Sequence, residues 1–70
     1  MKNTNLVKFA ARLKELRKAE KKTQMDMAEL LGCSISNYQK IEYGLINIPI
    51  TSLIALADFF GVTTDYLLDR

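Results

Sequence analysis

Apolar residues recur at helical spacing along most of this chain. Two sets show the spacing clearly: Phe9, Leu13 and Leu16 near the N-terminus, and Leu53, Leu56, Ala57 and Phe60 in the second half. Steps of three and four residues place side chains on one face of a helix, whereas a half-buried strand alternates apolar and polar residues. No alternating segment is present, so the pattern predicts an all-α fold.

Cap and stop residues divide this pattern into five helices. Thr23 and Ser34 are suited to accept a hydrogen bond at a helix start, and Gly32, Gly44 and Gly61 to end a helix in the left-handed conformation. Thr63 or Thr64 caps a last turn. The predicted helices span residues 6–20, 24–31, 35–42, 51–60 and 65–68, with residues 1–5 as a flexible N-terminal arm and residues 6–70 as one compact domain.

Composition narrows the chemistry that such a domain can perform. With 70 residues, 49% of them apolar, and a net charge of +2, the chain should fold as a single small domain. Cys33 is the only cysteine and histidine is absent, so we expect no intramolecular disulfide, no zinc site and no cofactor. A histidine base is missing, the thiol has no evident activator and the carboxylates are scattered, which argues against an enzyme.

Charge and hydropathy bear on the partners and the compartment. Residues 1–22 carry eight lysines and arginines against two glutamates, whereas residues 23–70 carry two against six acids. The basic end is either the footprint of a polyanion or an ordinary solvated helix. Residues 45–62 have Asp58 as their only charge, but polar residues and Pro49 interrupt them too often for a membrane span. Because no signal peptide is evident either, we expect a cytoplasmic protein.

The second and third predicted helices, joined by a short turn that contains Gly32, form a helix-turn-helix, which places its second helix in the major groove of DNA. At 100° per residue that helix has two faces: one carries Ile35, Ser36, Gln39 and Lys40, and the other carries Asn37, Tyr38, Ile41 and Glu42. Tyr38 and Ile41 are large and apolar, so their face should pack inward. The opposite face is predicted to read bases: glutamine suits adenine, lysine suits guanine, serine is permissive and isoleucine suits a thymine methyl.

The residues of this unit resemble a known signature. Thr23-Gln24-x-x-Met27-Ala28-x-x-Leu31-Gly32-x-Ser34, followed by Ile41-Glu42-x-Gly44, is similar to the motif of the Cro and phage-repressor family, also called the xenobiotic response element family. The similarity continues through Leu53, Leu56-Ala57, Gly61-Val62 and Asp65-Tyr66-Leu67-Leu68, and covers about residues 9–68. It implies a five-helix repressor-like domain and a sequence-specific DNA-binding regulator, a repressor of phage, mobile-element or bacterial origin.

Phosphate contacts are expected at the start of the helix that begins at Gln24, where free backbone N–H groups favour anions. The resemblance implies that Gln24 contacts the DNA backbone. Many relatives carry lysine or arginine directly after Glu-x-Gly, whereas this chain has Leu45 and Ile46 there. The full set predicted to contact phosphates is therefore Thr23, Gln24, Tyr43, Lys8 and Arg12. The resemblance also implies a salt bridge, at least half buried, between Arg17 and Glu42.

The apolar loop 45–50 predicts a binding partner, because a solvated loop seldom carries so many apolar side chains. A domain that reads a few base pairs needs a second copy, so we expect a homodimer, in solution or formed only on DNA, on a palindromic operator. The predicted interface is Leu45, Ile46, Ile48, Tyr66 and Leu67, with Leu45 and Ile46 exposed in the monomer and Ile50 packed under the following helix. The alternative is a protein-interaction module, antitoxin-like or anti-repressor-like, that uses loop 45–50.

Overall fold

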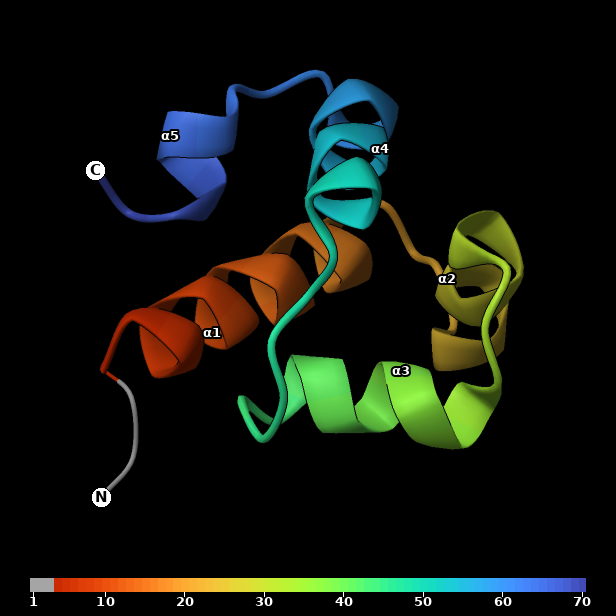
Figure 1. The fold of residues 1–70 in the computed structure, drawn as a ribbon. Coiled ribbons are helices and arrows are strands. Elements are labelled where there is room, and N and C mark those ends of the chain that lie inside the picture. The colour runs from red at the N-terminus through yellow and green to blue at the C-terminus, as the bar shows by residue number, and fades with distance from the viewer. Residues whose placement is uncertain (1–3) are drawn as a thin grey trace.

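The computed structural model describes residues 4–70, which form five helices and no strand. They are α1 (Thr4–Ala19), α2 (Gln24–Leu31), α3 (Ile35–Glu42), α4 (Ile50–Phe60) and α5 (Thr64–Leu67). Figure 1 shows α3 below α1, with α2 beside it and with α4 and α5 above. The predicted all-α class and the predicted bounds of α2 and α3 are confirmed.

The other helix bounds differ from the prediction by one or two residues, and the N-terminal arm is shorter than expected. Helix α1 begins at Thr4, so Thr4 and Asn5 are helical and the prediction of an arm was wrong for them. The rest of that arm, residues 1–3, lies outside the described residues. Helix α4 begins at Ile50, directly after Pro49, whose fixed φ of −60° suits the position before a helix.

Side-chain caps start α2, α3 and α5. Thr23 Oγ1 accepts from the backbone N–H of Asp26 at 3.0 Å, and the Asp26 carboxylate accepts from the backbone N–H of Thr23 at 2.9 Å, which completes a capping box. Ser34 Oγ accepts from the backbone N–H of Asn37 at 3.0 Å, and Thr63 caps α5 in the same way. The caps set where α2 and α3 begin and therefore which residues each helix exposes.

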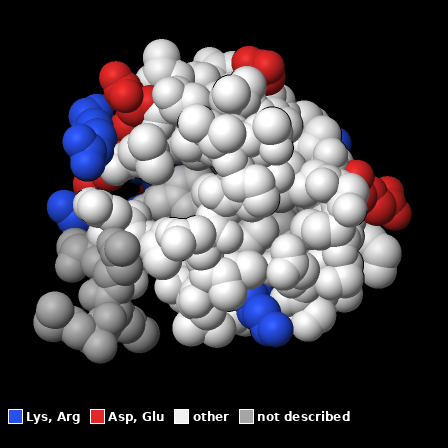
Figure 2. All heavy atoms as spheres, viewed as in Figure 1, with Lys and Arg blue, Asp and Glu red and all other residues white. Residues whose placement is uncertain are grey.

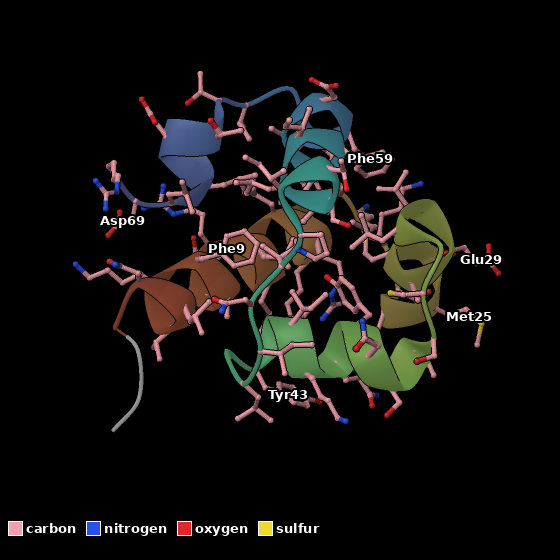
Figure 3. All side chains as sticks on the ribbon, viewed as in Figure 1. Phe9, Met25, Glu29, Tyr43, Phe59 and Asp69 are labelled. Atoms are coloured by element: carbon pink, nitrogen blue, oxygen red, sulfur yellow. The ribbon has the colours of Figure 1, made fainter. Side chains whose placement is uncertain are left out.

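The core lies where the helices meet. Helix α3 packs against α1 and α2, and α5 packs against α1 and α4. The fully buried side chains with the largest volumes come from all five helices: Tyr38, Leu13, Met27, Leu56 and Leu67. Phe9 also lies in this core, under the connection from α3 to α4 in the view of Figure 3. Both α2 and α3 are thus anchored on their inner faces, which leaves their outer faces for function.

Gly44 ends the α3 region where two backbones approach closely. Its φ of 74° lies in the left-handed region, and a Cβ built on it would lie 3.4 Å from the carbonyl oxygen of Leu6 and from the Cα of Val7. Glycine suits this position because it takes the positive φ without strain and leaves room for the start of α1. The turn sends the chain away from α3 along loop 45–50 toward α4 (Figure 1).

Ser34 and Ser36 offer a matched test of the α3 cap. Ser34→Ala removes the hydrogen bond to the Asn37 N–H, and we expect the free energy of unfolding to fall by about 0.5–2 kcal/mol. Ser36→Ala removes an exposed hydroxyl inside the helix and should change it by about 0.5 kcal/mol or less. Urea denaturation of both variants checks this. Equal losses would show that the cap does not stabilise α3.

Candidate nucleic-acid interface

The outer face of α3 is polar and accessible. Ser36 and Lys40 are exposed there, Ile35 is partly exposed at the first turn, and Gln39 is half-buried. Tyr38 and Ile41 are buried, as the helical pattern predicts. The four residues expected to read bases therefore share the outer face, which carries donors, acceptors and one apolar contact.

Asn37 is a residue that sequence reasoning missed. It was placed on the inner face with Tyr38, Ile41 and Glu42, and this assignment was wrong because the structure exposes its side chain. At 100° per residue it lies at the border between the two faces. Its polarity was the available signal, because an unpaired amide at the edge of an apolar face is less costly in water than in the core.

Tyr43, the C-terminal cap of α3, is one of the most exposed aromatic residues described. Figure 3 shows it at the lower edge of the molecule, at the end of α3 that lies nearest the start of α1. A phenol hydroxyl in this position is free to face a phosphate beside a helix lying in the groove.

Gln24 and Gln39 are hydrogen-bonded to each other, a contact that the sequence did not predict. Gln39 Nε2 donates to Gln24 Oε1 at 3.1 Å, and Gln24 Nε2 donates to Glu42 Oε1 at 3.3 Å. The first residue of α2 is thereby connected to two successive turns of α3. The residue expected to touch phosphate and one of those expected to read bases form a single unit.

The predicted ion pair between Arg17 and Glu42 is present and bidentate. Arg17 Nε and Nη2 each donate to a carboxylate oxygen at 2.8 Å, and Arg17 Nη1 donates to the backbone oxygen of Lys22 at 2.9 Å. The Glu42 side chain is 0% exposed and that of Arg17 is 12% exposed. One guanidinium therefore ties α1, the chain leading into α2 and the last turn of α3 together.

Electrostatics within this cluster favours the ionised pair. Burial opposes ionisation of Glu42, but the hydrogen bonds and the positive charge of Arg17, together with the neighbouring Tyr38 and Gln24 side chains, outweigh it, so the pKa of Glu42 is lowered. The hydrogen bond to Glu42 raises the pKa of Arg17. The Tyr38 hydroxyl is buried without a hydrogen-bond partner in the described structure, and burial together with the Glu42 charge raises the pKa of Tyr38. Glu42 is thus a permanent anion at neutral pH.

Thr23 is occupied by its capping role. Its side-chain oxygen accepts from the backbone N–H of Asp26, and its backbone N–H donates to the exposed Asp26 carboxylate, which lowers the pKa of that carboxyl. The carboxylate already places a negative charge at the N-terminus of α2. Gln24, rather than Thr23, is therefore the better placed of the two predicted phosphate contacts.

Lys8 and Arg12 are ion-paired with the C-terminal turn of the chain. The Arg12 guanidinium lies over the Tyr66 ring, 4.2 Å from its centroid, and donates to Asp69 Oδ1 at 2.7 Å. Lys8 Nζ lies 3.8 Å from Asp69 Oδ2. Figure 3 shows Asp69 on the opposite side of α1 from α3. The sequence pattern did not place the C-terminal turn beside α1, and the contact of these two cations with DNA phosphates stays a prediction.

The predicted dimer surface is only partly exposed. Leu45 is 61% exposed as expected, whereas Ile46 and Ile48 are half-buried and pack against the core. Leu67 is 0% exposed, so its assignment to the surface was wrong, because the inner face of α5 points to the core. Ile50 was expected to pack inward but is 72% exposed, since it is the first residue of α4 and has no preceding turn to cover it.

The face that carries loop 45–50 and the start of α4 is nearly free of charge. Figure 2 shows few charged atoms across its middle and charged groups mainly at its edges. An apolar hollow of about 410 Å³ opens beside the loop, lined by Asn5, Leu6, Phe9, Asn47, Ile48, Ile50, Leu53 and Leu68.

The remaining residue of the predicted dimer surface, Tyr66, is exposed on α5, where its ring lies under the Arg12 guanidinium. Among residues 4–70, no helix has the length and apolar character to cross a membrane.

The Arg17–Glu42 pair makes the stability of the fold dependent on pH. Because the folded-state pKa of Glu42 is lowered, its contribution is complete at neutral pH and is lost as the pH falls below about 4.5. Glu42→Gln should lower the free energy of unfolding at pH 7 by about 3 kcal/mol, the lower end of the cost of breaking a buried pair. Urea denaturation between pH 7 and pH 3 should show this gap closing.

Asp26→Asn is the control for this titration. Its carboxyl also has a lowered pKa but is exposed, so the variant should lose less stability at pH 7 and keep the steep acid dependence that Glu42 causes. Parallel pH profiles for the wild type and Glu42→Gln would contradict the assignment.

Comparison with known proteins identifies relatives of this arrangement. The family model described as helix-turn-helix matches residues 13–67. Two regulators of Bacillus subtilis (strain 168), the uncharacterized HTH-type transcriptional regulator YobD and the SPbeta prophage-derived YonR, are each 37% identical over 60 residues, which are 86% of this chain. The cryptic phage CTXphi transcriptional repressor RstR of Vibrio cholerae is 36% identical over 64 residues, or 91% of the chain.

The matched regions are 54%, 56% and 57% of YobD, YonR and RstR, so the chain spans about half the length of these curated relatives. Among solved structures, the restriction-modification controller protein C.AhdI from Aeromonas hydrophila has a TM-score of 0.81 and 32% identity, with 93% of this chain and 98% of that chain covered. The family match and the shared fold confirm the resemblance: the chain belongs to the Cro/C1-type helix-turn-helix family, the xenobiotic response element family.

Proposed function

We propose that this chain is a sequence-specific DNA-binding transcriptional regulator, a repressor that occupies its operator with α3 in the major groove. The observation that carries the proposal is the outer face of α3, where Ser36 and Lys40 are exposed above a buried and ion-paired inner face. The printed functions of YobD, YonR and RstR, all transcriptional regulators or repressors, support it.

Base reading belongs to the exposed side chains of α3. Lys40 presents an ammonium group suited to the O6 and N7 acceptors of guanine, and Ser36 offers a donor and an acceptor. Ile35 provides an apolar contact for a thymine methyl, and Gln39 reaches the groove with the part of its amide that Gln24 leaves available. Asn37 joins this set because it is exposed beside Ser36.

Phosphate contacts flank this helix. Gln24 is the first residue of α2, next to the capping box, and its side-chain amide is suited to donate to a phosphate oxygen. Tyr43 stands at the other end of α3 with an exposed hydroxyl. Two contacts at opposite ends of the recognition helix fix its register in the groove without reading sequence.

A second copy completes the proposed regulator. A single α3 has eight residues and reads only a few base pairs, so a two-fold dimer on a palindromic operator provides the missing specificity. The exposed apolar side chains of Leu45 and Ile50, together with the exposed Tyr66 on α5, are the surface that a second copy would cover. Ile46 and Ile48 support this surface from below, because they pack against the core.

DNA recognition is tested by two lysine substitutions of the same type at different places. A duplex is first selected from a random library with the wild-type protein. Lys40→Ala should weaken binding to that duplex by about 1–3 kcal/mol and relax preference at one base pair, because it removes a base contact. Lys8→Ala removes a cation that faces Asp69, away from the outer face of α3, and should leave the base preference unchanged. Fluorescence anisotropy at fixed salt measures both.

Failure of the wild type to enrich any sequence would contradict the proposed function. Retention of an unrelated protein on loop 45–50 in the same experiment would then favour the alternative, a protein-interaction module. Equal weakening of selected and random duplexes by Lys40→Ala would reassign Lys40 to the phosphate contacts.

Dimer formation is tested at the apolar surface. Leu45→Lys and Ile50→Lys place charge where a second copy would bury apolar area, so binding to a full palindrome should become weaker and less cooperative while a half-site binds as before. Leu30→Lys is the control, since Leu30 is similarly exposed but belongs to α2. Steep binding to the palindrome by both loop variants would exclude this surface as the interface.

A further inference from the structure

We propose that the Glu42 carboxylate is a positioning group for DNA reading: it sets the direction of the amide hydrogen bonds of Gln24 and Gln39 and thereby the donor and acceptor pattern that α3 presents to a base. This inference rests on the proposed DNA-binding function and adds to it a role for a residue that lies outside the DNA surface. Glu42 is fully buried and acts only through its neighbours.

The argument begins with the chemistry of a carboxylate, which accepts hydrogen bonds and cannot donate them. Glu42 Oε2 accepts from Arg17 Nε, and Glu42 Oε1 accepts from Arg17 Nη2 and from Gln24 Nε2. Gln24 must therefore turn its NH₂ group toward Glu42. A flipped Gln24 would place its oxygen against a buried anion, a repulsive arrangement with no hydrogen bond.

The orientation of Gln24 dictates that of Gln39. With its NH₂ group on Glu42, Gln24 has only its oxygen to offer, and Gln39 Nε2 donates to that oxygen at 3.1 Å. In this series of hydrogen bonds every donor points toward Glu42: Gln39 donates to Gln24, and Gln24 donates to Glu42. A charge buried in the core is thus transmitted through two neutral amides to the edge of α3.

The groups left over on the two amides define what faces DNA. Gln39 retains its oxygen and one N–H, the donor and acceptor pair that matches the N7 and N6–H of adenine. Gln24 retains one N–H, which suits a phosphate oxygen. Both side chains are half-buried, so each has one edge in the network and one edge near the surface. An amide held in one orientation reads with less ambiguity than an amide that rotates freely.

Two substitutions distinguish the positioning role of Glu42 from its contribution to the stability of the fold. Arg17→Lys weakens the bidentate pair but leaves the carboxylate ionised and able to accept from Gln24. Glu42→Gln keeps the size of the side chain but replaces one acceptor by a donor, so that Gln24 is free to bond in either direction. Both variants lose stability, and only the second loses the directional constraint.

The experiment compares the wild type, Arg17→Lys and Glu42→Gln on the selected duplex and on duplexes substituted at each base pair. The wild type should discriminate by a factor of about ten or more at the base pair that faces Gln39. Glu42→Gln should reduce that factor severalfold, and Arg17→Lys should preserve it at a temperature where both variants are folded. Preserved discrimination in Glu42→Gln, or an equal loss in both variants, would overturn the proposal.

Side-chain amide NMR of the free protein gives a second readout that does not need DNA. The Nε2 protons of Gln24 and Gln39 should show shifted, slowly exchanging resonances in the wild type and in Arg17→Lys, and solvent-like resonances in Glu42→Gln. Solvent-like resonances in the wild type would overturn the inference even where DNA binding is selective. Absence of selective binding with the wild-type resonances as expected would instead overturn the proposed function.

Gln24→Met covers the case in which Glu42→Gln does not fold. This substitution keeps the ion pair and interrupts the chain of amides, so Gln39 should lose its shifted resonance and discrimination should fall at the same base pair. Unchanged discrimination in Gln24→Met, together with the overall loss of affinity that a missing phosphate contact causes, would contradict the proposal.

Discussion

The bidentate pair between Arg17 and Glu42 is the interaction on which the rest of the structure depends. It joins the last turn of α1 to the last turn of α3, and the third donor of the same guanidinium binds the carbonyl oxygen of Lys22 just before α2. Two ions taken out of water gain little net stability against apolar residues of similar volume. The pair instead fixes the register of three segments at once, because a planar guanidinium and a carboxylate meet in few geometries.

That register decides what the outer face of the helix-turn-helix presents. With Tyr38 and Ile41 in the core and Glu42 on Arg17, the polar residues of α3 have only the solvent side left. The hydrogen bonds from Gln39 to Gln24 and from Gln24 to Glu42 extend the same constraint from the core to the surface. Under the proposed function, one buried anion that DNA does not reach therefore couples the stability of the fold to base recognition.

The surface of the protein has three regions that differ in polarity and charge. Polar side chains cover α3, an uncharged face carries loop 45–50 and the start of α4, and the cations Lys8 and Arg12 hold the C-terminal turn against α1. Lys8, Arg12 and Arg17, three of the eight cations in residues 1–22, are thereby paired with carboxylates. In the proposed function, affinity comes from a few directed contacts and from the pairing of two copies.

The sequence by itself determined the local features, since helix spacing, caps and glycine stops act over a few residues. Thr23, Ser34, Gly32 and Gly44 specified the bounds of α2 and α3, and the family signature implied the pairing of Arg17 with Glu42. Tertiary structure decided which neighbours each polar side chain meets. Arg12 lies 54 positions before Tyr66, and Gln24 lies 15 before Gln39, so no local pattern reveals either contact. Helix packing likewise decided that Leu67 is buried and that Ile50 and Asn37 are exposed. A periodic pattern shows which face of a helix is apolar, but not how far the contact with its neighbours extends around and along that helix.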